Sequence, residues 1–262
     1  MTPEPSPAEE EVTKSSARLP LPPLLAGRRA VVTGAARGIG KAVADAFDEA
    51  GATAVRLDIR AADTVRACDV ADEASVARAF AAIAAEGPID DVIHVATIAA
   101  VGPLADMPLA DFRRVIDVNL TGAFLIAREA TRHLGRGGNL VLFASQYGLK
   151  GWPLWGAYCA SKAGVLRLAD SLVGELAPKG IRVNTISPGT VDTEMVAATT
   201  AEVARQSGTD VATIRAQYEA AIPMGRYARP EEMAYVAVAL CSGLCSYVSG
   251  SNIVVDGGEL SR

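Results

Sequence analysis

Short apolar runs alternate along this chain with longer segments whose apolar residues recur at helical spacing. The runs are rich in Val, Ile and Leu and lack polar alternation, which predicts strands covered on both faces. Such runs are AVV (30–32), AVRL (54–57), DVIHVA (91–96), NLVLFAS (139–145), IRVNTIS (181–187) and NIVVD (252–256). The segments with helical spacing span residues 38–50, 72–86, 108–134, 157–177 and 230–242.

This alternation predicts the α/β class, with a doubly wound parallel sheet and helices on both of its faces. Nothing within residues 28–262 indicates a linker, so we expect a single domain there. In sheets of this type, ligands bind at the carboxyl ends of the strands. Only 11 residues separate Asp58 from Asp69, too few for a crossover helix, so a loop is predicted between them.

Two segments differ from the rest of the chain in composition and in their pattern of apolar residues. Residues 1–27 are rich in proline and glutamate, which predicts a flexible Pro-rich N-terminal tail; the alternative for LPLPPLL (19–25) is that it lies along the body. Residues 194–229 predict two short helices broken at Ser207-Gly208. Above the carboxyl edge of the sheet this segment would form a lid over the substrate site, and an oligomer contact is the alternative.

Composition narrows the classes of partner. The formal net charge is −5, so there is no electrostatic basis for binding nucleic acid or an anionic membrane. No apolar stretch reaches the length of a membrane span, and the acidic, proline-broken start is not a signal peptide. Four cysteines and two histidines are too few and too scattered for a disulfide framework or a metal site. A reducing cytoplasm is therefore the expected location.

A glycine-rich turn follows the first predicted strand and opens the first predicted helix, reading Thr33-Gly34-Ala35-Ala36-Arg37-Gly38-Ile39-Gly40. Gly34 permits the tight turn, Gly38 lets the backbone approach a phosphate, and Gly40 lets the helix pack closely on the strand. The unpaired N–H groups at the start of the helix favour a pyrophosphate. This placement predicts a dinucleotide site.

The second predicted strand ends at Asp58, 18 residues after Gly40. An acid at about this distance binds a ribose 2′-hydroxyl and repels a 2′-phosphate, so NAD is expected as the cofactor. NADP stays open as an alternative, because the guanidinium groups of Arg37 and Arg60 could reach a 2′-phosphate.

Tyr158 and Lys162 lie one turn apart on one face of a predicted helix. An ammonium beside a phenol favours the phenolate and is expected to lower the pKa of Tyr158 from about 10 toward working pH, as an acid/base for an alcohol requires. Ser145 ends a strand at the same edge, where its hydroxyl could hold a carbonyl oxygen. Asn119 lies in an apolar helical run next to Gly122, where a locally opened turn would let it bond backbone or water.

Together these motifs resemble those of the short-chain dehydrogenase/reductases over roughly residues 27–260. The matching motifs are Thr33-Gly-x-x-x-Gly-Ile-Gly40, Asp69, Asn119, Ser145, Tyr158-x-x-x-Lys162, Pro188-Gly189-x-x-x-Thr193 and Val255-Asp256-Gly257-Gly258. The resemblance implies a Rossmann fold and a nicotinamide-dependent oxidoreductase, usually a homotetramer or homodimer. With NAD, it would interconvert a secondary alcohol and a ketone.

The resemblance also implies roles for individual residues. Tyr158 would be the general acid/base, Lys162 would hold the nicotinamide ribose, Ser145 would position the substrate oxygen, and Asn119 would hold a water in a proton relay. Besides Asn119, Tyr158 and Lys162, the implied cofactor-binding residues are Gly34, Arg37, Gly38, Ile39, Gly40, Asp58, Asp69, Val70, Ala96, Val191 and Thr193.

One segment departs from the family pattern. His94-Val95-Ala96-Thr97 stands where the family has Asn-Asn-Ala-Gly. Thr97 thus replaces a glycine beside the cofactor ribose. His94 is interpreted as an interior polar group with its hydrogen bonds satisfied, rather than as a catalyst.

The stretch between Ser145 and Tyr158 is expected to wall the substrate site. Substrate binding is assigned to Ser145, Gln146, Trp152 and Tyr158, with Tyr147, Leu154 and Trp155 beside them. Two tryptophans and no cluster of Arg or Lys predict an apolar or ring-bearing alcohol or ketone. Two alternatives remain: an NADPH-dependent ketone or 3-oxoacyl reductase, and a non-catalytic nucleotide-binding protein.

Overall fold

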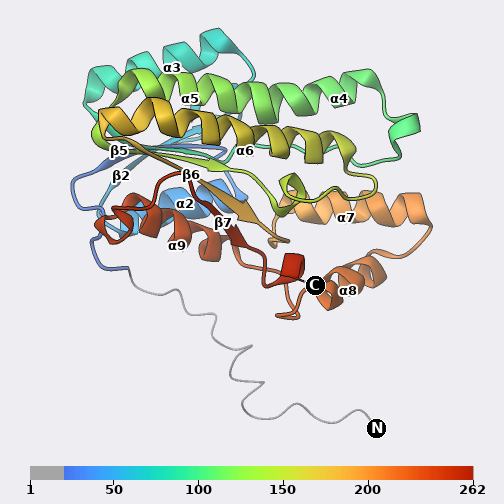
Figure 1. Cartoon of the computed structure of the whole chain (residues 1–262). Coiled ribbons are helices and arrows are strands. Elements are labelled where there is room, and N and C mark those ends of the chain that lie inside the picture. Colours follow the sequence, from blue (N-terminus) through green and yellow to red (C-terminus); the bar gives the residue numbers. More distant parts are fainter. Residues whose placement is uncertain (1–20, 262) are drawn as a thin grey trace, which may run out of the picture.

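A computed structural model describes residues 21–261 of the chain. These residues contain one seven-stranded parallel sheet with the order β3-β2-β1-β4-β5-β6-β7, so the direction of winding reverses between β1 and β4 (Figure 1). This is the doubly wound Rossmann arrangement that the sequence predicts. The strands are β1 (Arg29–Thr33), β2 (Thr53–Asp58), β3 (Val65–Ala67), β4 (Ile89–His94), β5 (Leu134–Phe143), β6 (Arg182–Pro188) and β7 (Asn252–Val255).

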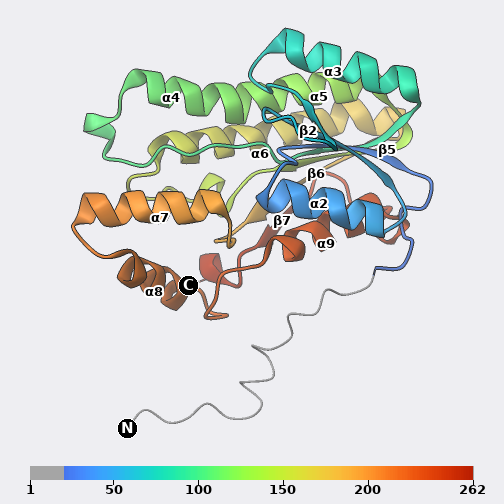
Figure 2. The ribbon, with the colours of Figure 1, turned by 180° about the vertical axis from the view of Figure 1, so that it is seen from behind.

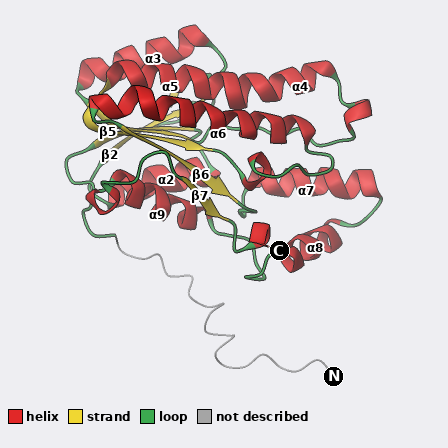
Figure 3. Cartoon of the chain, in the orientation of Figure 1, coloured by secondary structure: helices red, strands yellow, loops and turns green. Residues whose placement is uncertain are grey.

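Helices cover both faces of the sheet. In Figure 1, α3, α4, α5 and α6 lie above it and α2 and α9 below it, and the reverse view in Figure 2 agrees. Figure 3 shows the strands enclosed between these two helical layers. Each face has its own apolar core, one around Phe80 and Ile126 and one around Phe47 and Val238. The helices are α2 (Gly38–Glu49), α3 (Glu73–Glu86), α4 (Leu109–Ile116), α5 (Gly122–His133), α6 (Gly156–Leu176), α7 (Glu194–Ser207), α8 (Val211–Ala221) and α9 (Pro230–Cys241).

All six predicted strands are present, with ends that differ by a few residues. The largest difference is at β5, which begins at Leu134 rather than Asn139, and its register against β4 shifts between Ile89 and Asp91. The absence of a helix between β2 and Asp69 is confirmed. The sequence did not predict β3, which pairs with β2 at the edge of the sheet, because three residues are too short for a periodic pattern.

The helix predicted over residues 108–134 is divided in three. A π-turn, Asp117–Thr121, lies between α4 and α5, and the backbone stays helical at both of its flanking residues. Asn119 lies in this wider turn and is fully buried. The locally opened turn expected at Asn119 is therefore confirmed, and it has the form of a π-bulge, a feature frequent at functional sites.

The predicted pair of helices within residues 194–229 is also confirmed. Gly208 adopts a left-handed conformation, with φ of +64°, and ends α7. The Thr193 hydroxyl caps the start of α7, and the Asp210 carboxylate caps the start of α8. Both helices lie beyond the carboxyl edge of the sheet (Figure 1).

The described chain makes core contacts before residue 28. The Leu25 side chain is fully buried among α2 and α9 residues, and its backbone N–H donates to the Ala50 carbonyl at 2.9 Å. This contact agrees with the alternative that LPLPPLL lies along the body. Most of the predicted tail, residues 1–20, falls outside the described residues.

Within residues 21–261, no helix combines the length and the apolar character needed to cross a membrane.

Candidate active site

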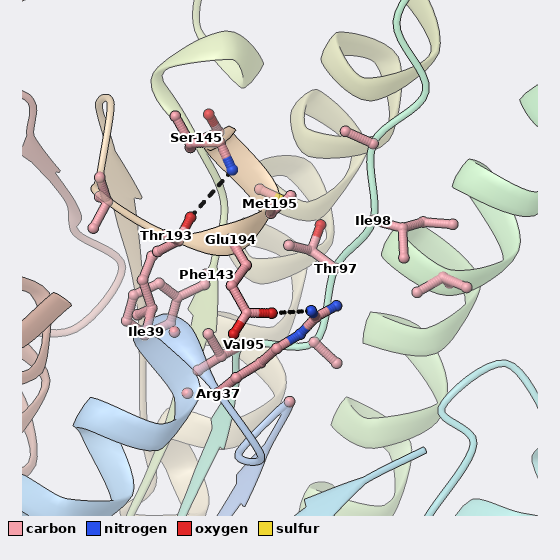
Figure 4. Close-up of a pocket in the computed structure, with 18 of the residues that line it drawn as sticks. Arg37, Ile39, Val95, Thr97, Ile98, Phe143, Ser145, Thr193, Glu194 and Met195 are labelled. Carbon is pink, nitrogen blue, oxygen red and sulfur yellow. Dashed lines mark hydrogen bonds and ion pairs between the residues drawn. The ribbon is translucent and has the colours of Figure 1, made fainter. Parts of the chain in front are cut away.

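A cavity of about 550 Å³ opens at the carboxyl ends of β1, β2, β4, β5 and β6. Its lining combines the glycine-rich turn, the start of the lid and the residues proposed for chemistry (Figure 4). Of the residues implied in cofactor binding, the following line it: Gly34, Arg37, Gly38, Ile39, Gly40, Asp58, Asp69, Val70, Ala96, Tyr158, Lys162, Val191 and Thr193. Residues far apart in the sequence therefore meet at the edge where a doubly wound sheet binds its ligands.

Two positions of the glycine-rich turn, Gly34 and Gly40, leave no room for a side chain. Gly34 has φ of +67°, and a Cβ there would lie 2.8 Å from the Ala96 backbone. A Cβ at Gly40 would collide with the Gly34 carbonyl oxygen, so this residue permits the close contact between α2 and β1. No side chain caps the N-terminus of α2. The narrow turn and the uncapped helix start fit a nicotinamide dinucleotide, whose pyrophosphate the N–H groups of α2 would hold.

Asp58 lies at the end of β2, where both of its carboxylate oxygens accept backbone hydrogen bonds. The N–H of Ala36 donates at 3.1 Å and the N–H of Arg60 at 3.0 Å. The Arg37 guanidinium is paired instead with the Glu194 carboxylate, the first residue of α7 (Figure 4). Of the two arginines considered for a 2′-phosphate, Arg37 is thus already engaged by the lid, while Arg60 lines the cavity beside Asp58.

Ser145, Tyr158 and Lys162 converge on the cavity from β5 and α6. All three are buried, and the Lys162 ammonium lies 5.7 Å from the centre of the Tyr158 ring. The ammonium nitrogen of Lys162 donates a hydrogen bond to the Phe143 carbonyl at 2.8 Å. Tyr and Lys therefore share one helical face, as their spacing predicts, and the Lys side chain is held by the end of β5.

The predicted lowering of the Tyr158 pKa is wrong for this arrangement. Burial raises the pKa of Tyr158 to about 12, and the Ser145 and Thr97 hydroxyls beside it offset only part of that rise. Burial also lowers the pKa of Lys162 to about 7. The sequence argument counted the attraction between an ammonium and a phenolate but not the removal of both groups from water, which disfavours each charged form.

The Asn119 side chain is bonded to the backbone that follows β4 and to α6. Its side-chain amide accepts from the Ile98 N–H and donates to the Ile98 carbonyl, both at 2.9 Å. The same amide nitrogen lies 3.0 Å from the Ser161 hydroxyl of α6. Asn119 does not line the cavity; its side chain holds the segment that follows β4.

The His94 ring is interior, but only one of its nitrogens has a partner among the described residues. The Thr33 hydroxyl oxygen accepts from the backbone N–H groups of Val95 and Ala96, so its own proton points to His94 Nδ1 at 2.8 Å. The remaining ring proton is then on Nε2, which makes no hydrogen bond. The prediction of a fully satisfied histidine is thus half right. Burial and the nearby Lys162 lower the pKa of His94 to about 3, so the ring is neutral.

Two residues assigned to substrate binding do not line this cavity. The Gln146 side chain is buried and donates to the Glu259 carboxylate at 2.8 Å. Trp152 stacks on Tyr147 with ring centres 4.9 Å apart, and Tyr147 in turn meets the Tyr158 ring edge-on. Trp152 therefore supports the Tyr158 ring only through Tyr147, and Gln146 is held by Glu259.

Several lining residues were missed or given only as part of a range. Thr97 and Ile98 follow β4, and Glu194, Met195 and Val196 begin the lid helix (Figure 4). The departure at Thr97 was visible in the sequence, and the position of the lid was predicted. The sequence offered no signal for Ile98, because its place depends on the Asn119 contact across the fold.

Comparison with known proteins agrees with this geometry. A family model described as enoyl-(acyl carrier protein) reductase matches residues 34–259. A cis-4-hydroxycyclohexanecarboxylate dehydrogenase from Sinomonas cyclohexanicum is 40% identical over 251 residues, covering 89% of this chain and 96% of that protein. An uncharacterized short-chain type dehydrogenase/reductase from Sinorhizobium fredii is 37% identical over 251 residues; the match covers 90% of this chain but only 44% of that longer protein.

Among solved structures, the ligand-free aldohexose dehydrogenase of Thermoplasma acidophilum superposes with a TM-score of 0.84 at 29% identity. The superposition covers 91% of this chain and 96% of that one. Fold and length therefore agree between the two proteins.

Proposed function

Because this chain belongs to the short-chain dehydrogenase/reductase family, we propose that it oxidises a neutral, ring-bearing secondary alcohol to the ketone with NAD as hydride acceptor. Membership of the family makes it a nicotinamide-dependent oxidoreductase acting on alcohol or carbonyl groups. The choice of NAD, the class of alcohol and the residue roles are the parts proposed here. The observation that carries them is the convergence of Ser145, Tyr158 and Lys162 on the cavity that contains the glycine-rich turn.

Tyr158 is the proposed acid/base. In the oxidation direction its phenolate oxygen accepts the proton of the alcohol hydroxyl. The hydrogen on the carbon that bears this hydroxyl leaves with its electron pair as hydride, and the C–O bond becomes C=O. The bound nicotinamide supplies the chemistry that the side chains lack, because it accepts the hydride or returns it in the reverse direction. Ser145 is proposed to hold the alcohol oxygen against Tyr158, and Lys162 to hold the nicotinamide ribose.

Asp58 supports NAD over NADP. Its carboxylate is fixed at the end of β2 by two backbone N–H groups, beside the turn that would hold the pyrophosphate. A fixed negative charge there favours a ribose hydroxyl and repels a phosphate. The pairing of Arg37 with Glu194 adds to this preference, since it leaves fewer cationic groups for a 2′-phosphate.

The lining of the cavity supports a neutral substrate. Besides the residues assigned to the cofactor and to chemistry, it offers the Thr97 hydroxyl, the apolar side chains of Ile98, Met195 and Val196, and the Arg114 guanidinium, whose charge is paired with Asp111. Two related proteins are named for ring-bearing alcohols, a hydroxycyclohexanecarboxylate and an aldohexose. They support the ring; the first of these substrates is itself an anion, so the neutral charge is argued from the lining alone. We also propose a homo-oligomer, as is usual in the family.

The cofactor proposal is tested by initial rates with NAD and NADP on a panel containing cyclic alcohols with and without a carboxylate, polyols, and a 3-oxoacyl thioester for the reverse reaction. We expect a preference for NAD of at least about tenfold in kcat/KM, which Asp58→Asn should reduce or reverse. Asp63→Asn, in the exposed loop that follows β2, is the matched control and should keep the preference.

A strong NADP preference in the wild type would contradict the role of Asp58. With turnover of the thioester, it would favour the NADPH-dependent reductase alternative, for which Arg60 is placed beside the cavity. Cofactor binding without turnover of any compound would favour a non-catalytic nucleotide-binding protein.

A further inference from the structure

Thr97 brings a third hydroxyl to the proposed reaction site. It lies three residues beyond the end of β4 and lines the same cavity as Ser145 (Figure 4). Tyr158 also lines this cavity. The Thr97 hydroxyl oxygen is buried and makes no well-formed hydrogen bond within the described residues 21–261, but it lies close enough to Tyr158 to lower the pKa of that phenol. A buried hydroxyl without a partner is costly, so its retention at a reaction site indicates a use for it there.

The position of Thr97 is fixed relative to Tyr158 by a continuous set of hydrogen bonds. Asn119 clasps both backbone groups of the next residue, Ile98, and its amide also donates to the Ser161 hydroxyl. Ser161 donates in turn to the Tyr158 carbonyl at 2.7 Å. The backbone after β4 is therefore tied to the turn of α6 that carries the proposed acid/base.

The surroundings of Tyr158 leave few groups that could stabilise its charged form. The titratable side chains that face it are Lys162 and Cys159 on α6 and Tyr147 after β5. Cys159 raises the pKa of Tyr158, and the Lys162 ammonium is already bonded to the Phe143 carbonyl. The groups that lower that pKa are the hydroxyls of Ser145 and Thr97.

These two hydroxyls are not equally available. The Ser145 oxygen already accepts the Tyr147 N–H at 3.1 Å, and in the proposed reaction its own proton points to the substrate oxygen. The Thr97 hydroxyl accepts no such backbone hydrogen bond, and the proposed reaction does not use its proton on the substrate. Because Thr is branched at Cβ, its χ1 rotamer is restricted, so the hydroxyl can be held in one direction.

We propose that Thr97 donates a hydrogen bond to the Tyr158 phenolate oxygen and so supports the form that accepts the alcohol proton. This inference rests on the proposed function. It also gives a purpose to the departure from the family pattern, since the glycine found at this position in the family has no hydroxyl to offer.

The test compares the pH dependence of kcat/KM for alcohol oxidation in the wild type, Thr97→Val and Thr97→Ser. Valine keeps the shape of threonine and removes the donor, whereas serine keeps the donor. A hydrogen bond to a charged group is strong enough that its loss should move the ascending limb of the profile up by about one pH unit. On the acid side of that limb, kcat/KM should fall about tenfold for Thr97→Val, and Thr97→Ser should restore most of it.

Two controls separate this role from a merely structural one. Thr199→Val removes a hydroxyl that lines the same cavity but is bonded to the Met195 and Val196 carbonyls, so its profile should keep the wild-type limb. NADH affinity, measured by fluorescence, should stay within about twofold in Thr97→Val, because the proposed partner is Tyr158 and not the cofactor.

The outcomes distinguish this inference from the proposed function. If the wild type is active and Thr97→Val keeps the wild-type pH profile, the role of Thr97 is wrong and the proposed function stands. A loss confined to NADH affinity would also overturn that role. If the wild type oxidises no alcohol at all, the proposed function fails and this inference fails with it.

Discussion

Tyr158 and Lys162 lie one turn apart on α6, and both are removed almost completely from water. Burial raises the pKa of the phenol to about 12 and lowers the pKa of the ammonium to about 7. The two residues therefore start from protonation states that resist the charge changes their chemistry needs. Groups that stabilise the phenolate, such as the hydroxyls of Ser145 and Thr97, matter more in this site than the Tyr-x-x-x-Lys spacing alone indicates.

The buried Lys162 makes a prediction for stability against pH. Its pKa falls from an ordinary value near 10.5 to about 7 on folding, so between these values the unfolded chain binds more protons than the folded one. Stability should therefore rise with pH in that window, with a slope approaching ~1.4 kcal/mol per pH unit from this residue. Lys162→Met should remove this component.

Urea unfolding of both proteins at pH 7 and pH 9 measures the effect. The stability of the wild type relative to Lys162→Met should increase between the two pH values. A difference that stays constant would show that the Lys162 pKa is not lowered in the folded protein.

The sequence predicted most residues of the candidate site because their spacing and their positions at the ends of strands determine where the fold places them. Gly34, Asp58 and Tyr158 all line one cavity, as predicted. The sequence could not predict that burial raises the pKa of Tyr158, nor that the Asn119 side-chain amide is hydrogen-bonded to the Ile98 backbone. Both depend on which segments pack together, and spacing along the chain does not record that.

Two elements give the site its particular form: the π-turn between α4 and α5, and the helix pair α7 and α8, for which a lid is proposed. In the π-turn the Asn119 side chain is hydrogen-bonded to the backbone of Ile98, the residue that follows Thr97. This contact positions the segment after β4. The lid begins at Glu194, which pairs with Arg37 of the glycine-rich turn. This ion pair joins the glycine-rich turn to the start of α7 (Figure 4).

The Arg37–Glu194 pair predicts faster cofactor release when it is broken. Both side chains are largely exposed, so the pair is a weak tie, and Glu194→Gln should speed NADH dissociation by about two- to fivefold. Stopped-flow fluorescence measures the rate. Added salt should accelerate release from the wild type and have less effect on the variant.

Glu202→Gln is the matched control on the same helix. Glu202 pairs with Arg205 within α7 and does not touch the glycine-rich turn, so release should match the wild type. Equal rates for Glu194→Gln and the wild type would show that the pair does not restrain the lid.

Helices α7 and α8 could be predicted from the sequence because Gly208 separates them and polar residues cap their starts. The division of the helix predicted over residues 108–134 could be predicted only in part. The sequence indicated an opened turn at Asn119, but a π-turn keeps the helix almost continuous and leaves the apolar periodicity on either side intact.

For the whole molecule, apolar strands between helices were sufficient to predict a parallel sheet covered on both faces. The order of the strands then places the glycine-rich turn and Tyr158 at one edge. β3 escaped prediction because it is short and lies at the sheet edge, with two of its three residues exposed. The wall of the substrate site was harder to predict, because Gln146 and Trp152 turn away from the cavity to contact Glu259 and Tyr147.

The measurement that tests the account most directly is the initial rate of NAD reduction with cyclic secondary alcohols, by the wild type and by Tyr158→Phe. The wild type should form NADH and ketone in equal amounts. Tyr158→Phe should lose about a thousandfold in kcat, because it lacks the group that takes the proton, while binding NADH with nearly unchanged affinity. Activity in Tyr158→Phe close to that of the wild type would contradict the account.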